Sequence, residues 1–322
     1  MSPSWQRSWC CAVLLAGGAF VVLVAGCRSG GASGVAATPT PDAPAGCAPT
    51  RAHAPGNTTE SIPTANGVRS YILHVPPGYD GAAALPLVLN LHGAGSNKEQ
   101  QAFYSGFPQK ADRERFILLT PDGAGTPRQW NFLGLASGAD DLGFLRAILD
   151  RSEASLCIDT SRVYATGISS GGAMSISLGC SLPERITAVA PVAALYLPPG
   201  CATTRPIPLI EFHGTDDPIV PFHGGKVGGI PSPDVEQAAA AWAKGDGCDA
   251  NDRVSQVSEH VKLEAYGGCR GGVTVELYVV DGGGHTWPGA RADVTLLGAT
   301  THEISGTDLI WQFFASQPIL TR

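Results

Sequence analysis

The sequence has few charged residues and contains no run of basic side chains. Charged residues make up 15% of the 322 residues, and 21 Lys and Arg against 28 Asp and Glu give a formal net charge of -7. A protein that binds nucleic acid neutralises phosphates with clustered Lys and Arg. Nucleic-acid binding is therefore excluded as a function class.

Signatures of several other classes are also missing. No glycine-rich phosphate loop and no G-x-G-x-x-G follows the first predicted strands, so no nucleotide cofactor is expected. The cysteines after residue 26 lack the C-x2-4-C spacing of a zinc site, so no metal is expected. The 41 Gly and 25 Pro lack the every-third-residue period of collagen. A hydrophobic share of 43% is still enough to fill a core, which excludes disorder for most of the chain.

Residues 1–26 have the pattern of an export signal. A single positive charge, Arg7, precedes the uncharged and mostly apolar stretch 9–24. The stretch ends in Val24-Ala25-Gly26-Cys27, which resembles the bacterial lipobox and implies a lipoprotein signal peptide with Cys27 as the lipidation site. An ordinary cleaved signal or an uncleaved anchor is the alternative.

Residues 27–58 are expected to be a flexible tether. The segment is mostly Gly, Ala, Ser, Thr and Pro with almost no aliphatic periodicity, so it buries too little surface to offset its ordering entropy. A lipid on Cys27 would hold a soluble domain, residues 59–322, close to the outer face of a bacterial membrane. The protein is accordingly expected in the cell envelope, with the membrane as a partner, or secreted.

The remaining cysteines agree with export. Without Cys10, Cys11 and Cys27, an even six remain for up to three disulfides in an oxidising compartment. Cys248 and Cys269 are the favoured pair, because they flank a segment that opens just after a predicted helix and ends before a predicted strand. The other pairings stay open.

Apolar runs and amphipathic stretches alternate along the rest of the chain. The expected strands are residues 68–75, 85–91, 116–120, 162–166, 186–192, 207–212 and 273–280. The expected helices are residues 98–107, 140–151, 171–181, 233–244 and 307–316. This alternation predicts one α/β domain with a mostly parallel, doubly wound sheet and helices on both faces. The short connections between strands predict no large lid.

A candidate nucleophile lies in Gly167-Ile168-Ser169-Ser170-Gly171, between a predicted strand and a predicted helix. Small residues at both ends of this pentapeptide permit a sharp turn that exposes the hydroxyl of Ser169 above the sheet. The same turn directs the Ser170 N–H and the positive end of the helix at a developing oxyanion.

A serine hydroxyl needs a base and an orienting acid, and both follow later strands in the order Ser, acid, His. Asp216 and Asp217 come after the strand 207–212, and composition alone does not separate them. His285 follows three glycines after the strand 273–280. His213 is a competing base, but it precedes the acid and breaks the chain order.

Taken together, these motifs resemble the α/β-hydrolase superfamily. Within it the chain is similar to secreted polyhydroxybutyrate depolymerase-like and feruloyl or acetyl-xylan esterases, including lipoproteins of the LpqC type. The resemblance rests on Leu91-His92-Gly93, Trp130-Asn131, Asp140-Asp141, the segment 162–169, His213-Gly214 with Asp217, and the segment 283–289.

The resemblance implies particular roles for several residues. It selects Asp217 as the triad acid and places the rest of the oxyanion hole at the His92-Gly93-Ala94 turn, with Gly93 and Ala94 as donors beside Ser170. Trp130 and Trp287 are candidates for the substrate cleft, with core packing as the alternative for each. His92 is a further cleft candidate, but a structural role in orienting the turn is favoured for it over a role as a second base.

The predicted activity is cofactor-free hydrolysis of short-chain or aryl esters attached to a polymer. The expected substrates are feruloyl or acetyl groups on polysaccharide, or hydroxybutyrate oligomers. An envelope acyltransferase or peptidase on the same fold, or a non-catalytic polymer-binding lipoprotein, is the alternative.

Overall fold

The computed structural model describes residues 46–65, 67–135, 138–198, 201, 205–250 and 253–320. The predicted signal peptide, the lipidation site Cys27 and most of the predicted tether lie outside these residues. No helix in the described part of the chain is long and apolar enough to cross a membrane.

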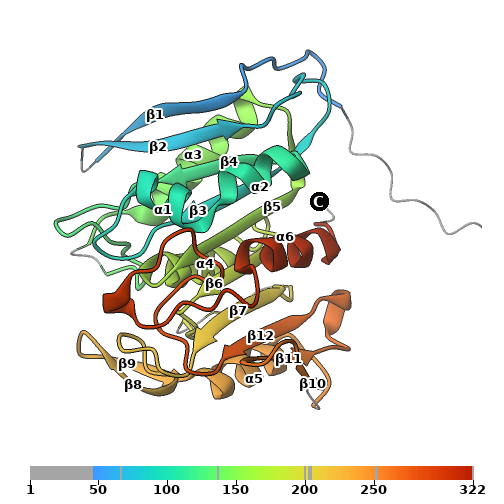
Figure 1. The fold of residues 1–322 in the computed structure, drawn as a ribbon. Helices are drawn as coiled ribbons and strands as arrows, with labels where there is room; N and C mark the ends of the chain where they lie inside the picture. Colours follow the sequence, from blue (N-terminus) through green and yellow to red (C-terminus); the bar gives the residue numbers. More distant parts are fainter. Residues whose placement is uncertain are drawn as a thin grey trace, which may run out of the picture. The chain divides into compact units, whose positions relative to one another are not determined.

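One ten-stranded sheet forms the centre of the fold (Figure 1), in the order β1-β2-β4-β3-β5-β6-β7-β12-β11-β10. Its strands are β1 Gly56–Thr64, β2 Gly67–Val75, β3 Leu85–Leu91, β4 Ile117–Pro121, β5 Ile158–Ile168, β6 Ala188–Val192, β7 Leu209–Gly214, β10 Arg253–Gln256, β11 Val261–Tyr266 and β12 Val275–Val280. The six strands from β4 to β12 are parallel, whereas β1, β2, β11 and β10 pair antiparallel at the two edges. The predicted mostly parallel sheet is therefore confirmed.

Helices cover both faces of this sheet. They are α1 Lys98–Ser105, α2 Phe107–Glu114, α3 Asp141–Ser155, α4 Ser170–Ser181, α5 Val235–Gly245 and α6 Gly306–Ser316. Figure 1 shows α1, α2 and α6 in front of the sheet and α3, α4 and α5 behind it. Two hydrophobic clusters result, because neighbouring residues of a strand such as Val88 and Leu89 face opposite sides. Strands β3, β4 and β6 are buried along their whole length, as expected for strands covered on both faces.

Some elements differ from the sequence prediction. The helix expected over residues 98–107 ends at Ser105, because Gly106 takes a left-handed conformation with φ 69° and α2 starts anew after it. The edge strands β1, β10 and β11 were not predicted. Strand β10 is exposed at every residue and has no apolar pattern to reveal it.

The folded domain also begins earlier than residue 59, so the expected boundary is wrong. Strand β1 starts at Gly56, and Cys47 is joined to Cys157 by a disulfide. Arg51 donates a hydrogen bond to the carbonyl of Leu156 at 3.0 Å. These partners lie about a hundred positions away, so local composition does not reveal that the segment is fastened to the domain.

Three disulfides are present: Cys47–Cys157, Cys180–Cys201 and Cys248–Cys269. The last is the pair favoured by the sequence. All six cysteines after residue 27 are used, which indicates an oxidising compartment.

The parallel strands bring the motifs to one edge of the sheet. His92, Ser169, Asp217 and His285 follow β3, β5, β7 and β12, all at carboxyl ends. A short hairpin made of β8 His223–Val227 and β9 Ile230–Asp234, rather than a large helical lid, follows Asp217.

Candidate active site

Ser169 lies in a sharp turn between β5 and α4, with φ 57° and ψ -124°. An L-residue seldom adopts a positive φ, and such strain persists only where the surroundings impose it. A Cβ on Gly167 would lie 2.5 Å from the carbonyl oxygen of Leu91, and one on Gly171 would lie 2.4 Å from the same atom. Only glycine at both positions lets this turn pack against the end of β3.

His285 is buried and its Nδ1 lies 2.8 Å from Oδ2 of Asp217. The other carboxylate oxygen of Asp217 accepts hydrogen bonds from the backbone N–H groups of Ile219 and Val220, both at 2.8 Å. Burial alone would raise the pKa of Asp217, but His285 and these two donors outweigh burial and lower it. An ionised Asp217 can thus accept a hydrogen bond from Nδ1–H of His285 and hold the imidazole in place.

The structure distinguishes the two neighbouring carboxyl groups of the loop after β7. Asp217 is buried and contacts His285, whereas Asp216 is exposed. Only Asp217 can orient the imidazole in this conformation.

Ser169 and His285 line the same pocket, which has a volume of about 440 Å³. Its other side chains are mainly apolar, including Phe103, Tyr104, Ile168, Ile219, Val294 and Leu297. Within the described residues the Ser169 hydroxyl makes no hydrogen bond. Catalytic hydrogen bonds are often long before substrate binds, so a free hydroxyl in this pocket is compatible with activation by His285.

Backbone N–H groups surround the same serine. A Cβ on Gly93 would lie 3.4 Å from Cβ of Ser169, so the turn after β3 lies directly beside the hydroxyl. In the described part of the chain, Gly93 and Ala94 donate no backbone hydrogen bond, and Ser170 is the first residue of α4, where an N–H has no helical acceptor. Three backbone N–H groups next to or near Ser169 therefore lack an acceptor among the described residues.

His92 fastens this turn and does not line the cleft. It is fully buried, its Nδ1 donates to the carbonyl of Gly93 at 2.8 Å, and its Nε2 accepts from the N–H of Gly123 at 2.8 Å. Burial lowers the pKa of His92, in agreement with the neutral form that this pattern requires. His92 lines neither the Ser169 pocket nor the pocket at Trp130, and its two hydrogen bonds agree with the structural role favoured for it in the sequence.

The two tryptophans also lie away from Ser169. Trp287 is fully buried, packs edge-to-face on Phe107 and donates its indole N–H to Thr307, so its assignment to the cleft is wrong. Trp130 donates its indole N–H to the carbonyl of His92 at 2.9 Å and lines a different pocket.

A buried carboxylate beneath this site was missed by the sequence analysis. Glu211 is fully buried in β7, and its Oε1 accepts from the backbone N–H of Ala194 and lies 3.0 Å from Nδ1 of His213. The Nε2 of His213 lies 2.9 Å from the carbonyl of Val220 and 3.5 Å from Asp217.

Both nitrogens of His213 therefore face acceptors. Burial alone would lower the pKa of His213, but the adjacent Glu211 outweighs burial and raises it. This pair holds the loop that carries Asp217. Glu211 lies within a predicted apolar strand. The one sequence signal that could have revealed its role is its place two residues before His213.

No group of three or more His, Cys, Asp or Glu side chains that could hold a metal ion occurs in the described ranges.

The fold and the turn at Ser169 define an α/β hydrolase. Among solved structures, an acetyl xylan esterase from Aspergillus awamori has the same fold, with a TM-score of 0.56, 16% identity, and coverage of 80% of this chain and 99% of that one.

Curated sequences identify the family. The chain is 31% identical to the putative esterase NocK of Nocardia uniformis subsp. tsuyamanensis over 92% of this chain and 96% of that protein. It is 33% identical to feruloyl esterase B of Piromyces equi over 67% of this chain but only 42% of that protein. Feruloyl esterase C of Emericella nidulans is 30% identical over 66% of this chain and 80% of that protein.

The model of the esterase PHB depolymerase family matches residues 69–193. This chain belongs to that family of carboxylic ester hydrolases.

The close approach at Gly171 gives a first prediction. Gly171→Ala should lower the free energy of unfolding by about 3 kcal/mol, because the new methyl group would collide with backbone atoms of Leu91 and His92. Esterase activity should fall at least about 100-fold, since small displacements of reacting groups are costly. The matched control is Gly245→Ala at the end of α5, where a Cβ meets no atom within 4 Å. Chemical denaturation measures the free energy of unfolding, and hydrolysis of p-nitrophenyl acetate measures the activity. If Gly171→Ala and Gly245→Ala lost the same stability and activity, the steric explanation would be wrong.

A second prediction concerns the buried pair of Glu211 and His213. Glu211→Gln and His213→Gln should each lower the free energy of unfolding by about 3 kcal/mol, because each leaves a buried partner uncompensated. The double variant should lose clearly less than the sum, as expected for residues in direct contact. Urea denaturation of the four proteins measures this coupling. Strict additivity would show that the two side chains do not act as a pair.

Proposed function

We propose that this protein is a serine carboxylester hydrolase in which Ser169 is the nucleophile, His285 the general base and Asp217 the orienting acid. The observation that carries the proposal is the hydrogen bond between Nδ1 of His285 and Oδ2 of Asp217 at 2.8 Å, with His285 lining the same pocket as the strained Ser169. Membership in a family of esterases supports the same activity.

The reaction begins when Ser169 Oγ attacks the ester carbonyl carbon and Nε2 of His285 takes the hydroxyl proton. Asp217 stabilises the imidazolium that forms. The backbone N–H groups of Gly93, Ala94 and Ser170 hold the negative oxygen, and each such donor is typically worth about 3 kcal/mol of barrier. His285 then protonates the leaving alcohol, which departs and leaves the acyl-enzyme. In the second half of the reaction, His285 takes a proton from water, the water oxygen attacks the acyl carbon, and His285 returns the proton to Ser169 Oγ as the acid is released.

The substrates we propose carry short acyl or aryl groups. Phe103, Tyr104 and Val294 give the Ser169 pocket an apolar wall suited to such groups. The named relatives include feruloyl esterases and an acetyl xylan esterase. We therefore favour feruloyl or acetyl groups on polysaccharide, with hydroxybutyrate oligomers as the other ester class.

We further propose that the enzyme works outside the cytoplasm of a bacterium, tethered by a lipid on Cys27. Residues 1–26 would be removed as the signal peptide. The tether would end before Cys47, where the disulfide to Cys157 fastens the chain to the domain. The three disulfides support an exported location.

Replacement of the nucleophile gives the primary test of this function. Ser169→Ala should lower turnover of a p-nitrophenyl ester about a millionfold, because the triad residues act as a unit. The variant should also lose labelling by a fluorophosphonate probe. A folded Ser169→Ala protein with near-normal hydrolysis would refute the assignment.

The adjacent aspartates provide a matched pair for the acid. Asp217→Asn should lower kcat about 10⁴-fold, as loss of the orienting carboxylate does in other triad enzymes. Asp216→Asn should leave kcat within about twofold, because Asp216 is exposed and outside the His285 contact. The reverse order of effects in steady-state kinetics would assign the acid to Asp216 instead.

A further inference from the structure

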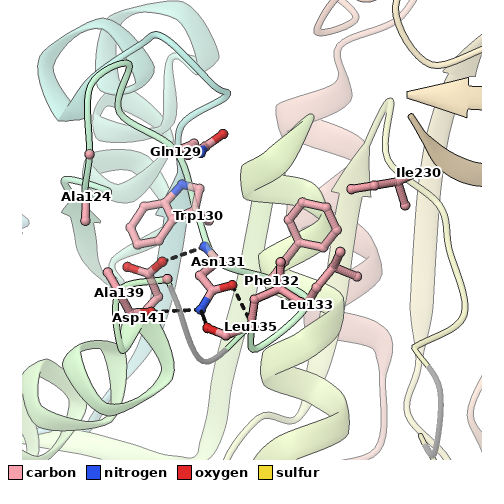
Figure 2. Close-up of a pocket in the computed structure, with 12 residues that line it drawn as sticks. Ala124, Gln129, Trp130, Asn131, Phe132, Leu133, Leu135, Ala139, Asp141 and Ile230 are labelled. Atoms are coloured by element: carbon pink, nitrogen blue, oxygen red, sulfur yellow. Dashed lines mark hydrogen bonds between the residues drawn. The ribbon is translucent and has the colours of Figure 1, made fainter. Parts of the chain in front are cut away.

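A second and larger pocket is formed by residues near those that hydrogen-bond to the turn carrying Gly93 and Ala94. It has a volume of about 620 Å³ and is lined by the loop after β4 and by Ile230 from the hairpin β8–β9. Figure 2 shows Gln129 and Trp130 on one side of this pocket and Phe132, Leu133 and Ile230 on the other. Neither Ser169 nor His285 lines it.

Trp130 in the lining, and two residues that neighbour the lining in sequence, are hydrogen-bonded to the candidate oxyanion turn. The indole N–H of Trp130 donates to His92 O at 2.9 Å, Gly95 N donates to Arg128 O at 2.7 Å, and Gly123 N donates to His92 Nε2 at 2.8 Å. The turn that lines the Ser169 pocket is therefore hydrogen-bonded to the segment that forms the second pocket. In a bound ester, the acyl chain and the alcohol extend from the carbonyl carbon in different directions, so one pocket can receive each.

Hydrogen bonds fasten several described residues in the wall of the second pocket. The side chain of Asn131 donates to the carbonyls of Leu135 and Ala139 and accepts from Leu135 N, as the dashed lines in Figure 2 indicate. Asn131 N donates to Asp141. A wall held in place before binding lowers the entropy cost of association.

Charge in the pocket favours a neutral ligand. Asp141 is the charged residue in the lining, and it forms an ion pair with Arg69 at 2.6 Å. The carboxamide of Gln129 is exposed and makes no hydrogen bond to any described residue, so it can both donate and accept.

Apolar side chains at the rim are unusually accessible. Leu135 is 57% exposed and Ile230 is 45% exposed. Apolar walls with a few free polar groups suit the C–H faces and hydroxyl groups of a sugar. The volume lies within the range of about 300–1,000 Å³ that holds drug-sized ligands, which is enough for a short oligosaccharide.

We propose that this second pocket binds the neutral oligosaccharide that carries the ester, on the leaving-alcohol side of Ser169. The inference rests on the proposed esterase function and adds to it the place where the polymer is held. The Ser169 pocket would then receive the acyl group.

Two matched pairs of esters test the inference. The first pair is a feruloylated arabinoxylo-oligosaccharide and methyl ferulate, and the second is an acetylated xylo-oligosaccharide and p-nitrophenyl acetate. Gln129→Ala, Leu135→Ser and Ile230→Ser should each lower kcat/KM for the oligosaccharide ester about tenfold, mainly through KM. Hydrolysis of the small ester should stay within about twofold.

Val254→Ser is the matched control, because Val254 is 61% exposed on β10 and lines neither pocket. It should leave both members of each pair unchanged. Equal loss on the small and the oligosaccharide ester, or no loss on either, would overturn the inference while leaving the esterase function intact. A wild-type protein that hydrolyses none of the four esters would overturn the proposed function and this inference together.

Discussion

The close backbone contact between the β5–α4 turn and the end of β3 is the constraint on which the site depends. Gly167 and Gly171 allow this contact, because any larger residue would enter the space of the Leu91 carbonyl. The contact places Gly93 beside Ser169 and keeps the serine at a positive φ. The backbone strain at Ser169 is therefore offset by the packing of the central strands. These strands are held in place by the two hydrophobic clusters, one on each face of the sheet.

A buried polar network supports the other half of the site. Glu211, His213, Asp217 and His285 follow one another at hydrogen-bond or ion-pair distance, from the interior of β7 to the pocket. Burying such groups is costly unless each has partners, and most of their polar atoms have one, with Glu211 Oε2 as an exception. The backbone N–H groups of Ala194 and Val220 complete the set, so the network also orders the loops after β6 and β7. Glu211 and His213, which do not contact the substrate, therefore help to position His285 through Asp217.

Much of this arrangement could be predicted from the sequence, and the failures have physical causes. Long apolar runs revealed the central strands, and the order Ser, acid, His could be found because each residue follows such a strand. Composition does not separate Asp216 from Asp217, and only the family resemblance selects Asp217, which the structure buries against His285. Trp287 is next to His285 in sequence but points into the core. Strand β10 is polar and exposed, and the Cys47–Cys157 link joins distant positions, so both needed the three-dimensional structure.

In the proposed mechanism, one hydroxyl, one imidazole and one set of backbone donors converge on the reacting carbonyl. A crystal structure of the protein inactivated by a fluorophosphonate is the sharpest test of this convergence. We expect phosphorus bonded to Ser169 Oγ, with its non-bridging oxygen within hydrogen-bond distance of the N–H groups of Ser170 and of Gly93 or Ala94, and His285 Nε2 facing the adduct. Phosphorus on another residue, or an oxygen directed away from those donors, would contradict it.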